Sequence, residues 1–151
     1  MVGQYLLNLF KNKNSVVRIC VTNPDSSYLQ CLKENWYERE TEKYSIEDIK
    51  RRIRETINTV KDLHRKAKLE VKENAATLII YQSNRDAPYS FYRADRKMIF
   101  VPKKRCNNKT FPTHCFIVEE SETTNGLFEW VSHDFDNTIK DNGAREYYRS
   151  S

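Results

Sequence analysis

The clearest structural signal in the chain lies in residues 15–27, which read Ser15-Val16-Val17-Arg18-Ile19-Cys20-Val21-Thr22-Asn23-Pro24-Asp25-Ser26-Ser27. The apolar first half of this stretch predicts a buried strand over Val16–Val21. Pro24 ends that strand, and Asp25 or Ser26 can cap the helix that follows. Open α/β sheets bind ligands at the carboxyl ends of such strands, so the polar loop is a candidate site.

The other segments alternate between helical and strand patterns. Ser45 and Asp48 have the spacing of a capping box, and apolar residues recur at helical spacing over Ile46–Leu63. Thr77–Tyr81 is a short apolar strand, and we expect its exit loop to open beside the loop after Val16–Val21. The remaining predictions are helices at Val2–Phe10, Tyr28–Trp36 and Leu127–Ile139, a hairpin of Tyr89–Arg93 and Lys97–Val101, and a strand at His114–Val118.

Length and composition favour one domain. The chain has 151 residues, of which 38% are hydrophobic, enough for a single ordinary core over residues 1–151. We predict an α/β fold with a mixed, mostly five-stranded sheet and helices on its faces. The short helix at the amino terminus is also consistent with a domain trimmed from a longer protein. Because no apolar run approaches the length of a bilayer span, and no secretory signal pattern is present, we expect a cytoplasmic protein without a membrane segment.

The cysteines do not predict a metal site. None of the four, Cys20, Cys31, Cys106 and Cys115, forms a CxxC pair, so we expect reduced thiols. A zinc site would need Cys106 and Cys115 to converge with His114, but adjacent residues of a strand point to opposite faces. With only three glycines, the chain also lacks a glycine-rich phosphate loop. We therefore predict no metal and no cofactor.

Basic residues cluster in the second half of the chain, while the net charge is only +5. Arg can hold a phosphate through two parallel hydrogen bonds, and hydroxyls and free amides supply neutral donors. The pattern therefore predicts a site for an anionic small molecule, such as a nucleotide, along one edge of the sheet. Its predicted ligand-binding residues are Asn23, Asp25, Ser26, Ser27, Arg85, Arg93, Asp95, Lys103, Lys104 and Arg105.

The same residues have a purely structural interpretation. Asp25 and Ser26 would only cap a helix, Arg93 and Asp95 would pair across the hairpin, and the lysines would be solvated. The aromatic residues of the hairpin also have two interpretations, packing in the core or stacking on a ligand. We assign Phe91 to packing, whereas Tyr89 and Tyr92 could pack or stack on nucleobases.

Three local motifs carry a resemblance to a known family. The segment Val17–Ser26 resembles the first strand and turn of a group of bacterial phospholipase D-like domains of unassigned function. The segment Ala87–Asp95 is similar to their hairpin, and Gly126–Trp130 is similar to their closing helix. The resemblance implies one half of a phospholipase D-like fold, and it also implies a homodimer.

The chain departs from the active members of that family in one respect. Their H-x-K-x(4)-D motif supplies a histidine nucleophile and a phosphate-gripping lysine, but here the corresponding hairpin reads Tyr92-Arg93-Ala94-Asp95-Arg96. The pair His64 and Lys66 falls on a helix, where we interpret it as part of a basic helix terminus. The resemblance therefore implies a degenerate domain.

Three functions remain open at this point. The first is a non-catalytic sensory or interaction domain that binds a phosphate-bearing ligand or a protein partner. The second is a phosphodiesterase or nuclease with a non-standard site, for which His114 is the candidate catalytic residue. The third is a nucleic-acid-binding module that uses the basic loop Lys103–Arg105.

Overall fold

In the residues that it describes, the computed structural model has four α-helices, a short 3-10 helix and six strands. It describes residues 2–13, 15–36, 45–85, 89–94, 96–102, 116–120, 126–140 and 144–150. The helices are α1 (Val2–Phe10), α2 (Tyr28–Trp36), α3 (Ile46–Val71), η2 (Lys72–Asn74) and α4 (Leu127–Lys140). The strands are β1 (Val16–Thr22), β2 (Thr77–Ser83), β3 (Tyr89–Ala94), β4 (Lys97–Pro102), β5 (Phe116–Glu119) and β6 (Ala144–Ser150).

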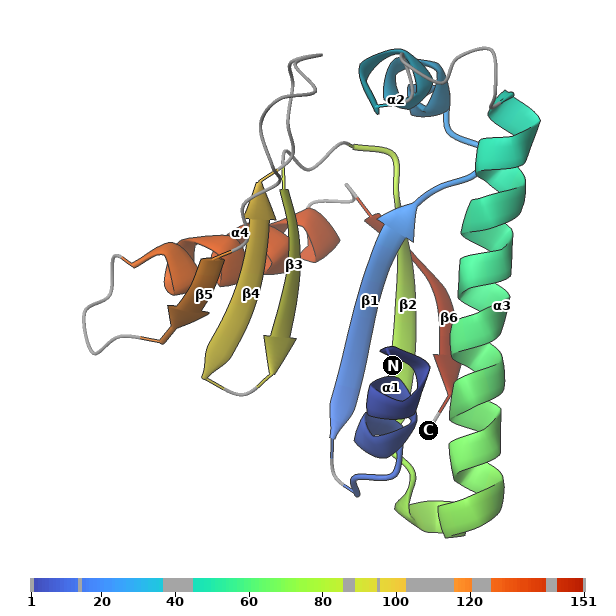
Figure 1. Cartoon of the computed structure of the whole chain (residues 1–151), viewed down its shortest axis with the longest axis vertical. Coiled ribbons are helices and arrows are strands. Elements are labelled where there is room, and N and C mark those ends of the chain that lie inside the picture. The colour runs from blue at the N-terminus through green and yellow to red at the C-terminus, as the bar shows by residue number, and fades with distance from the viewer. Residues whose placement is uncertain are drawn as a thin grey trace.

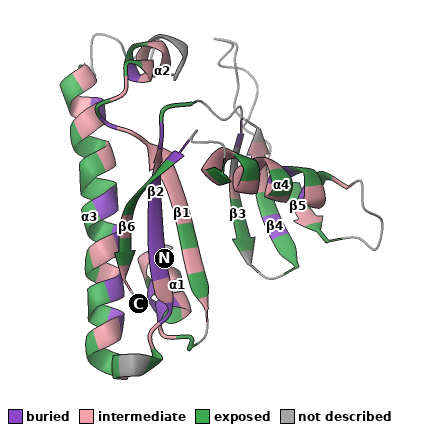
Figure 2. Cartoon of the chain, turned by 180° about the vertical axis from the view of Figure 1, so that it is seen from behind, coloured by how far each residue is buried: buried purple, intermediate pink, exposed green. Residues whose placement is uncertain are grey.

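The first sheet has the order β1-β2-β6. Its central strand β2 pairs in parallel with β1 and antiparallel with β6, and it is the most buried strand of the sheet (Figure 2). Helices α1 and α3 cover one face of this sheet (Figure 1). Leu78 and Ile80 of β2 pack there against Phe10 of α1 and Ile57 of α3. The main core of the protein is therefore the layer between β2 and these two helices.

Helix α3 forms for the reasons that its sequence suggests. The Ser45 side chain accepts a hydrogen bond from the Asp48 amide, and the Asp48 carboxylate accepts one from the Ser45 amide, so the expected capping box is present. The apolar stripe of the helix faces the sheet and includes Ile49 and Ile57. The buried stripe continues past Leu63 to His64 and Ala67, and the helix itself extends to Val71, beyond the predicted range Ile46–Leu63.

His64 belongs to that buried stripe and not to a solvated helix terminus. Its side chain is only 1% exposed, and its Nε2 atom lies 2.7 Å from the carbonyl oxygen of Ala76. Since a carbonyl oxygen can only accept a hydrogen bond, Nε2 of His64 carries a proton and donates the hydrogen bond to Ala76. The ring also meets Phe10 edge-on, at 5.2 Å between ring centroids. His64 thus links α3 to α1 and to the segment that leads into β2.

The second sheet has the order β3-β4-β5, and all its neighbours are antiparallel. The hairpin of β3 and β4 is confirmed, with Ala94 opposite Lys97. Helix α4 covers one face of this sheet, where Tyr89 and Met98 pack against Phe128 and Val131. This layer forms a second, smaller core.

Helix α4 also reaches the first sheet. Near its carboxyl end, Ile139 packs against a cluster that contains Ile79 and Tyr81 of β2, on the face opposite α3. Asp136 of α4 lies 3.5 Å from the guanidinium of Arg18 on β1. One amphipathic helix therefore contacts both sheets and joins them.

The α/β class is confirmed, but the expected five-stranded sheet is wrong. The described strands form two sheets of three strands each, and β3 to β5 form their own sheet instead of extending the first one. The edge of β2 not paired with β1 is taken by β6, which the sequence analysis missed. Strand β6 reads Ala-Arg-Glu-Tyr-Tyr-Arg-Ser, and it lacks the apolar alternation by which strands are predicted.

Within the described parts of the chain, no helix is long and apolar enough to cross a membrane.

Replacing His64 with alanine tests its structural role. The change removes a buried ring and the donor to Ala76, so we expect His64→Ala to lower the free energy of unfolding by about 2–4 kcal/mol in urea denaturation. The exposed neighbour Arg65 provides a matched control, and Arg65→Ala is expected to change stability by less than about 0.5 kcal/mol. Similar losses in the two variants would contradict the role of His64.

Candidate functional site

Two polar loops meet at the carboxyl ends of the parallel strands β1 and β2. Thr22 and Ser83 are register partners, and the Asn23 amide donates to the Ser83 carbonyl over 2.8 Å. Just after the paired residues of β1 and β2, Nδ2 of Asn23 donates a hydrogen bond to Oδ1 of Asn84 over 2.9 Å. The expectation that the second loop opens beside the first is confirmed. We call residues 23–27 together with 83–85 the loop pair.

The first loop of the loop pair is ordered by its own side chains. Oδ1 of Asn23 accepts from the Asp25 amide over 3.0 Å, which fixes a tight turn around the buried Pro24. Oγ of Ser26 accepts from the Tyr28 amide over 3.1 Å at the start of α2. The structural interpretation of Ser26 as a cap is thereby confirmed. Ser27 is exposed and follows directly.

Two arginines stand at this edge of the sheet: Arg85 belongs to the loop pair, and Arg54 reaches it from α3. Nη2 of Arg54, on α3, lies 3.1 Å from Oδ1 of Asp25, and both side chains are largely exposed. Arg85 is also exposed, and its amide donates to Oγ of Ser83 over 3.0 Å. Its guanidinium makes no hydrogen bond or ion pair with another residue that the structure describes. The loop pair therefore contains one carboxylate and one arginine, and the guanidinium of Arg54 lies beside that carboxylate.

Arg54 was not among the predicted site residues. It lies 29 positions from Asp25 on the exposed side of a helix rich in charged residues. No local motif marks it, because its proximity to the loop depends on how α3 crosses the sheet.

Arg93, by contrast, lies away from the loop pair. It stands near the carboxyl end of β3, which points down in Figure 1, whereas the loop pair is above the upper end of β1. Its Nη1 atom donates to Oγ of Ser132 over 3.0 Å, and its guanidinium lies 4.7 Å from the centre of the Phe128 ring. The prediction that Arg93 shares one sheet edge with Asn23 is wrong, because β3 belongs to the second sheet and points the other way.

Several predicted residues lie outside the described residues. They are Asp95, Lys103, Lys104 and Arg105 of the predicted ligand site, and His114 of the alternative catalytic site.

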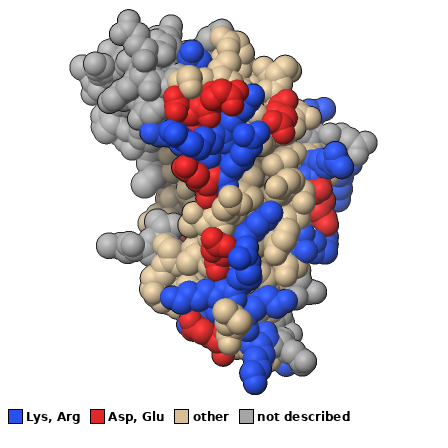
Figure 3. Space-filling model, turned by 90° about the vertical axis from the view of Figure 1, so that its right-hand side faces the viewer, with Lys and Arg blue, Asp and Glu red and all other residues tan. Residues whose placement is uncertain are grey.

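Ion pairs offset part of the basic charge on α3. Along its exposed face, Arg51 pairs with Asp48 and Arg65 pairs with Asp62, at 2.9 Å and 3.1 Å. Figure 3 views this side of the molecule, where groups of Asp and Glu side chains lie among more numerous Lys and Arg side chains. This helix therefore does not present a continuous basic surface.

The two cysteines that the structure describes are free thiols. Cys20 and Cys31 are both partly buried, and burial raises the pKa of the Cys20 thiol to about 11. At neutral pH Cys20 is therefore protonated and a poor nucleophile. Among the described residues, no three His, Cys, Asp or Glu side chains gather where they could hold a metal ion.

A partly buried polar contact joins β3 to α4 beside the second core. The hydroxyl of Tyr89 donates to Oδ2 of Asp134. The Tyr89 ring packs among aromatic side chains, with its centroid 5.2 Å from that of Phe100 and 5.6 Å from that of Trp130. Desolvation, and after it the hydrogen bond to Asp134, raises the pKa of Tyr89 well above its usual value. Tyr89 is thus a packing residue, as Phe91 is.

Comparison of the chain with protein-family models, with curated proteins and with solved structures found no match.

The raised pKa of Tyr89 predicts how stability changes in alkali. A group whose pKa is higher in the folded state contributes stability below its unfolded pKa, near 10 for tyrosine, and loses that contribution as the pH rises further. We expect the free energy of unfolding to fall more steeply above about pH 10 in the parent chain than in Tyr89→Phe. Urea denaturation at several pH values would measure how steeply the free energy of unfolding falls with pH in the two proteins. Equal slopes would contradict a raised pKa of Tyr89.

Proposed function

We propose that this chain is a non-catalytic binding domain whose loop pair takes a phosphate-bearing anion. The observation that carries the proposal is that the guanidinium of Arg54 reaches Asp25 in the first loop, while the second loop, joined to the first by the hydrogen bond between Asn23 and Asn84, ends in the exposed Arg85. The carboxyl edge of parallel strands is where α/β proteins commonly bind ligands. A guanidinium can hold a phosphate through two parallel hydrogen bonds, and two guanidiniums can hold two phosphates.

Asp25 has a defined part in this proposal. It occupies Arg54 through an exposed ion pair, and such pairs contribute only about 0–1 kcal/mol. A phosphate carries more charge than a carboxylate and can replace it on the same guanidinium at little cost. Asp25 would therefore act as an internal competitor that the ligand displaces. This arrangement favours ligands with several negative charges, such as a nucleotide.

The proposal does not include catalysis at the loop pair. Its described residues offer carboxylate, amide, hydroxyl and guanidinium groups, but neither an imidazole nor a thiol. His64 is buried in the main core, and His133 lies on the exposed side of α4.

We further propose that the domain is a degenerate half of the phospholipase D-like kind. The order of strand, helical crossover, strand, hairpin, strand and helix supports this proposal. The division of the strands into two sheets departs from the single sheet that the resemblance implies.

The binding proposal is tested by thermal denaturation with tripolyphosphate, ATP and inorganic phosphate, each against sodium chloride of equal ionic strength. At about 100 times the Kd, binding adds about 2.7 kcal/mol, so the Tm of a chain of this size should rise by about 5–10 °C. We expect Arg85→Ala to abolish most of that rise.

Arg65→Ala is the matched control, because it also removes one exposed guanidinium but lies on the far part of α3, away from Arg54. This variant should keep the full rise in Tm. A rise that Arg65→Ala and Arg85→Ala reduce equally would show general charge attraction and would contradict a site. No rise with any of the three anions would also overturn the proposal.

The competitor role of Asp25 predicts a gain of affinity. Asp25→Asn keeps the shape of the side chain and the backbone turn but removes the negative charge beside Arg54. We expect tripolyphosphate to bind this variant about 2–5 times more tightly, as measured by isothermal titration calorimetry. Weaker binding would mean that Asp25 contacts the ligand or orders the loop instead of competing with it.

A further inference from the structure

The second sheet has an exposed apolar row that crosses all three of its strands. Tyr92 of β3 is the register partner of Ile99 of β4, and Ile99 is the partner of Ile117 of β5. These side chains are 69%, 45% and 76% exposed. Directly opposite residues in a sheet point to the same face, so the three side chains form one continuous strip, which we call the apolar row.

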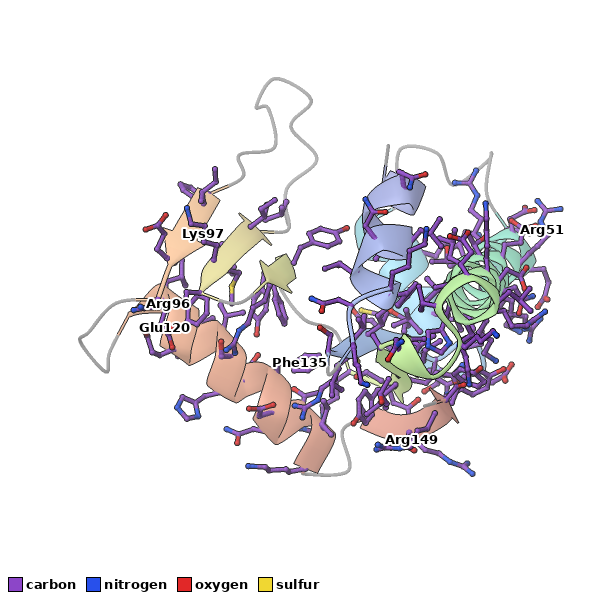
Figure 4. All side chains as sticks on the ribbon, turned by 90° about the horizontal axis from the view of Figure 1, so that it is seen from below. Arg51, Arg96, Lys97, Glu120, Phe135 and Arg149 are labelled. Carbon is purple, nitrogen blue, oxygen red and sulfur yellow. The ribbon has the colours of Figure 1, made fainter. Side chains whose placement is uncertain are left out.

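The apolar row lies on the face that α4 does not cover. The alternate residues of the same strands, such as Tyr89, Met98 and Val118, point to the other face and pack with Phe128 and Val131 of α4. Figure 1 views the sheet from the side opposite α4, and Figure 4 shows α4 lying below the three strands. Among the described elements, no helix covers the apolar row. A sheet face of this composition usually packs on another element.

The charges beside the apolar row are paired. Lys97 and Glu119 are the next register partners on the same face as the apolar row, and Nζ of Lys97 lies 2.9 Å from Oε1 of Glu119. Arg96 and Glu120 form a second pair at 2.9 Å, and both are labelled at this end of the sheet in Figure 4. The described border is therefore close to neutral. It gives a nucleic acid or an anionic membrane no excess of positive charge to bind.

The size of the face indicates what fits on it. Three strands about 4.8 Å apart, with β5 only four residues or about 13 Å long, present a flat area on the order of 200 Å². A stable dimer usually buries about 800 Å² on each partner, so this face by itself is too small for a second copy and suits a small partner that binds weakly. A helix is about 10 Å wide, and nine residues of it are about 13 Å long.

The protein itself provides examples of such packing. The nine-residue helix α1 covers part of the first sheet with Leu7 and Phe10, and the 14-residue helix α4 covers the other face of the second sheet. In both cases a few apolar residues on one side of a short helix are enough to cover the strands.

We propose that the apolar row is the docking surface for a short amphipathic helix of a partner protein. The helix would present apolar residues at positions i, i+3 or i+4 and i+7 to Tyr92, Ile99 and Ile117. It would complete a three-layer arrangement with α4 on the opposite face. Because the described border is neutral, this binding would depend only weakly on salt, in contrast to anion binding at the loop pair.

The test uses a synthetic, fluorescently labelled helical peptide of 14 residues that is stapled on its polar side, with leucines at helical spacing on the other side. A control peptide has the same composition but distributes its leucines around the helix. Fluorescence anisotropy against the full chain measures both. We expect the amphipathic peptide to bind at least ten times more tightly than the control, and we expect little change with added salt.

Ile117→Glu should weaken binding of the amphipathic peptide at least ten-fold. Ile117→Thr, which keeps a β-branched residue in the strand, should also weaken it, and thermal denaturation of both variants verifies that they fold. The matched control is Leu69→Glu, because Leu69 is 84% exposed on α3 and should not affect binding. Arg85→Ala should have no effect either, which separates this proposal from anion binding at the loop pair.

Three results would overturn the proposal. The first is equal affinity for the two peptides, or no saturable binding below about 1 mM. The second is binding that survives both substitutions of Ile117 in folded protein. The third is a dimer in sedimentation equilibrium that Ile117→Glu converts to a monomer, since the occupant would then be a second copy of this chain.

Discussion

The parallel pairing of β1 with β2 is the constraint on which the rest of the structure depends. Parallel neighbours cannot be joined by a tight turn, so the chain must cross from the end of β1 to the start of β2 through a long connection. Helices α2 and α3 make that connection, and α3 packs along the sheet with Ile57 against Leu78 and Ile80. The same pairing brings the carboxyl ends of both strands to one edge. The main core and the loop pair are therefore two results of one arrangement.

Helix α4 has the second organising role. Its first half covers β3, β4 and β5 through Phe128 and Val131, and its last turn reaches β2 through Ile139. The two sheets therefore share a helix. The contact between Tyr89 and Asp134 and that between Arg93 and Ser132 attach the same helix to β3. Arg93 is thus engaged with α4 at some distance from the loop pair.

The two proposed binding surfaces differ in their physical character. The loop pair is polar, includes the exposed Arg85, lies beside the guanidinium of Arg54, and suits an anion. The apolar row of Tyr92, Ile99 and Ile117 is bordered by paired charges and suits an apolar partner. The loop pair ends the first sheet, whereas the apolar row lies across the second sheet. An anionic ligand and a partner helix would therefore contact different elements of the domain.

The sequence by itself determined most of the local structure. The capping box at Ser45, the strand patterns of β1 and β2, and the hairpin of β3 and β4 depend on neighbouring residues, and the structure has all of them. The parallel strands also made the adjacency of the two loops predictable. Only the tertiary structure decided the contact of Arg54 with Asp25, the burial of His64, the position of Arg93 and the pairing of β6 with β2. These features depend on how distant segments pack, and neither periodicity nor residue type within one segment carries that information.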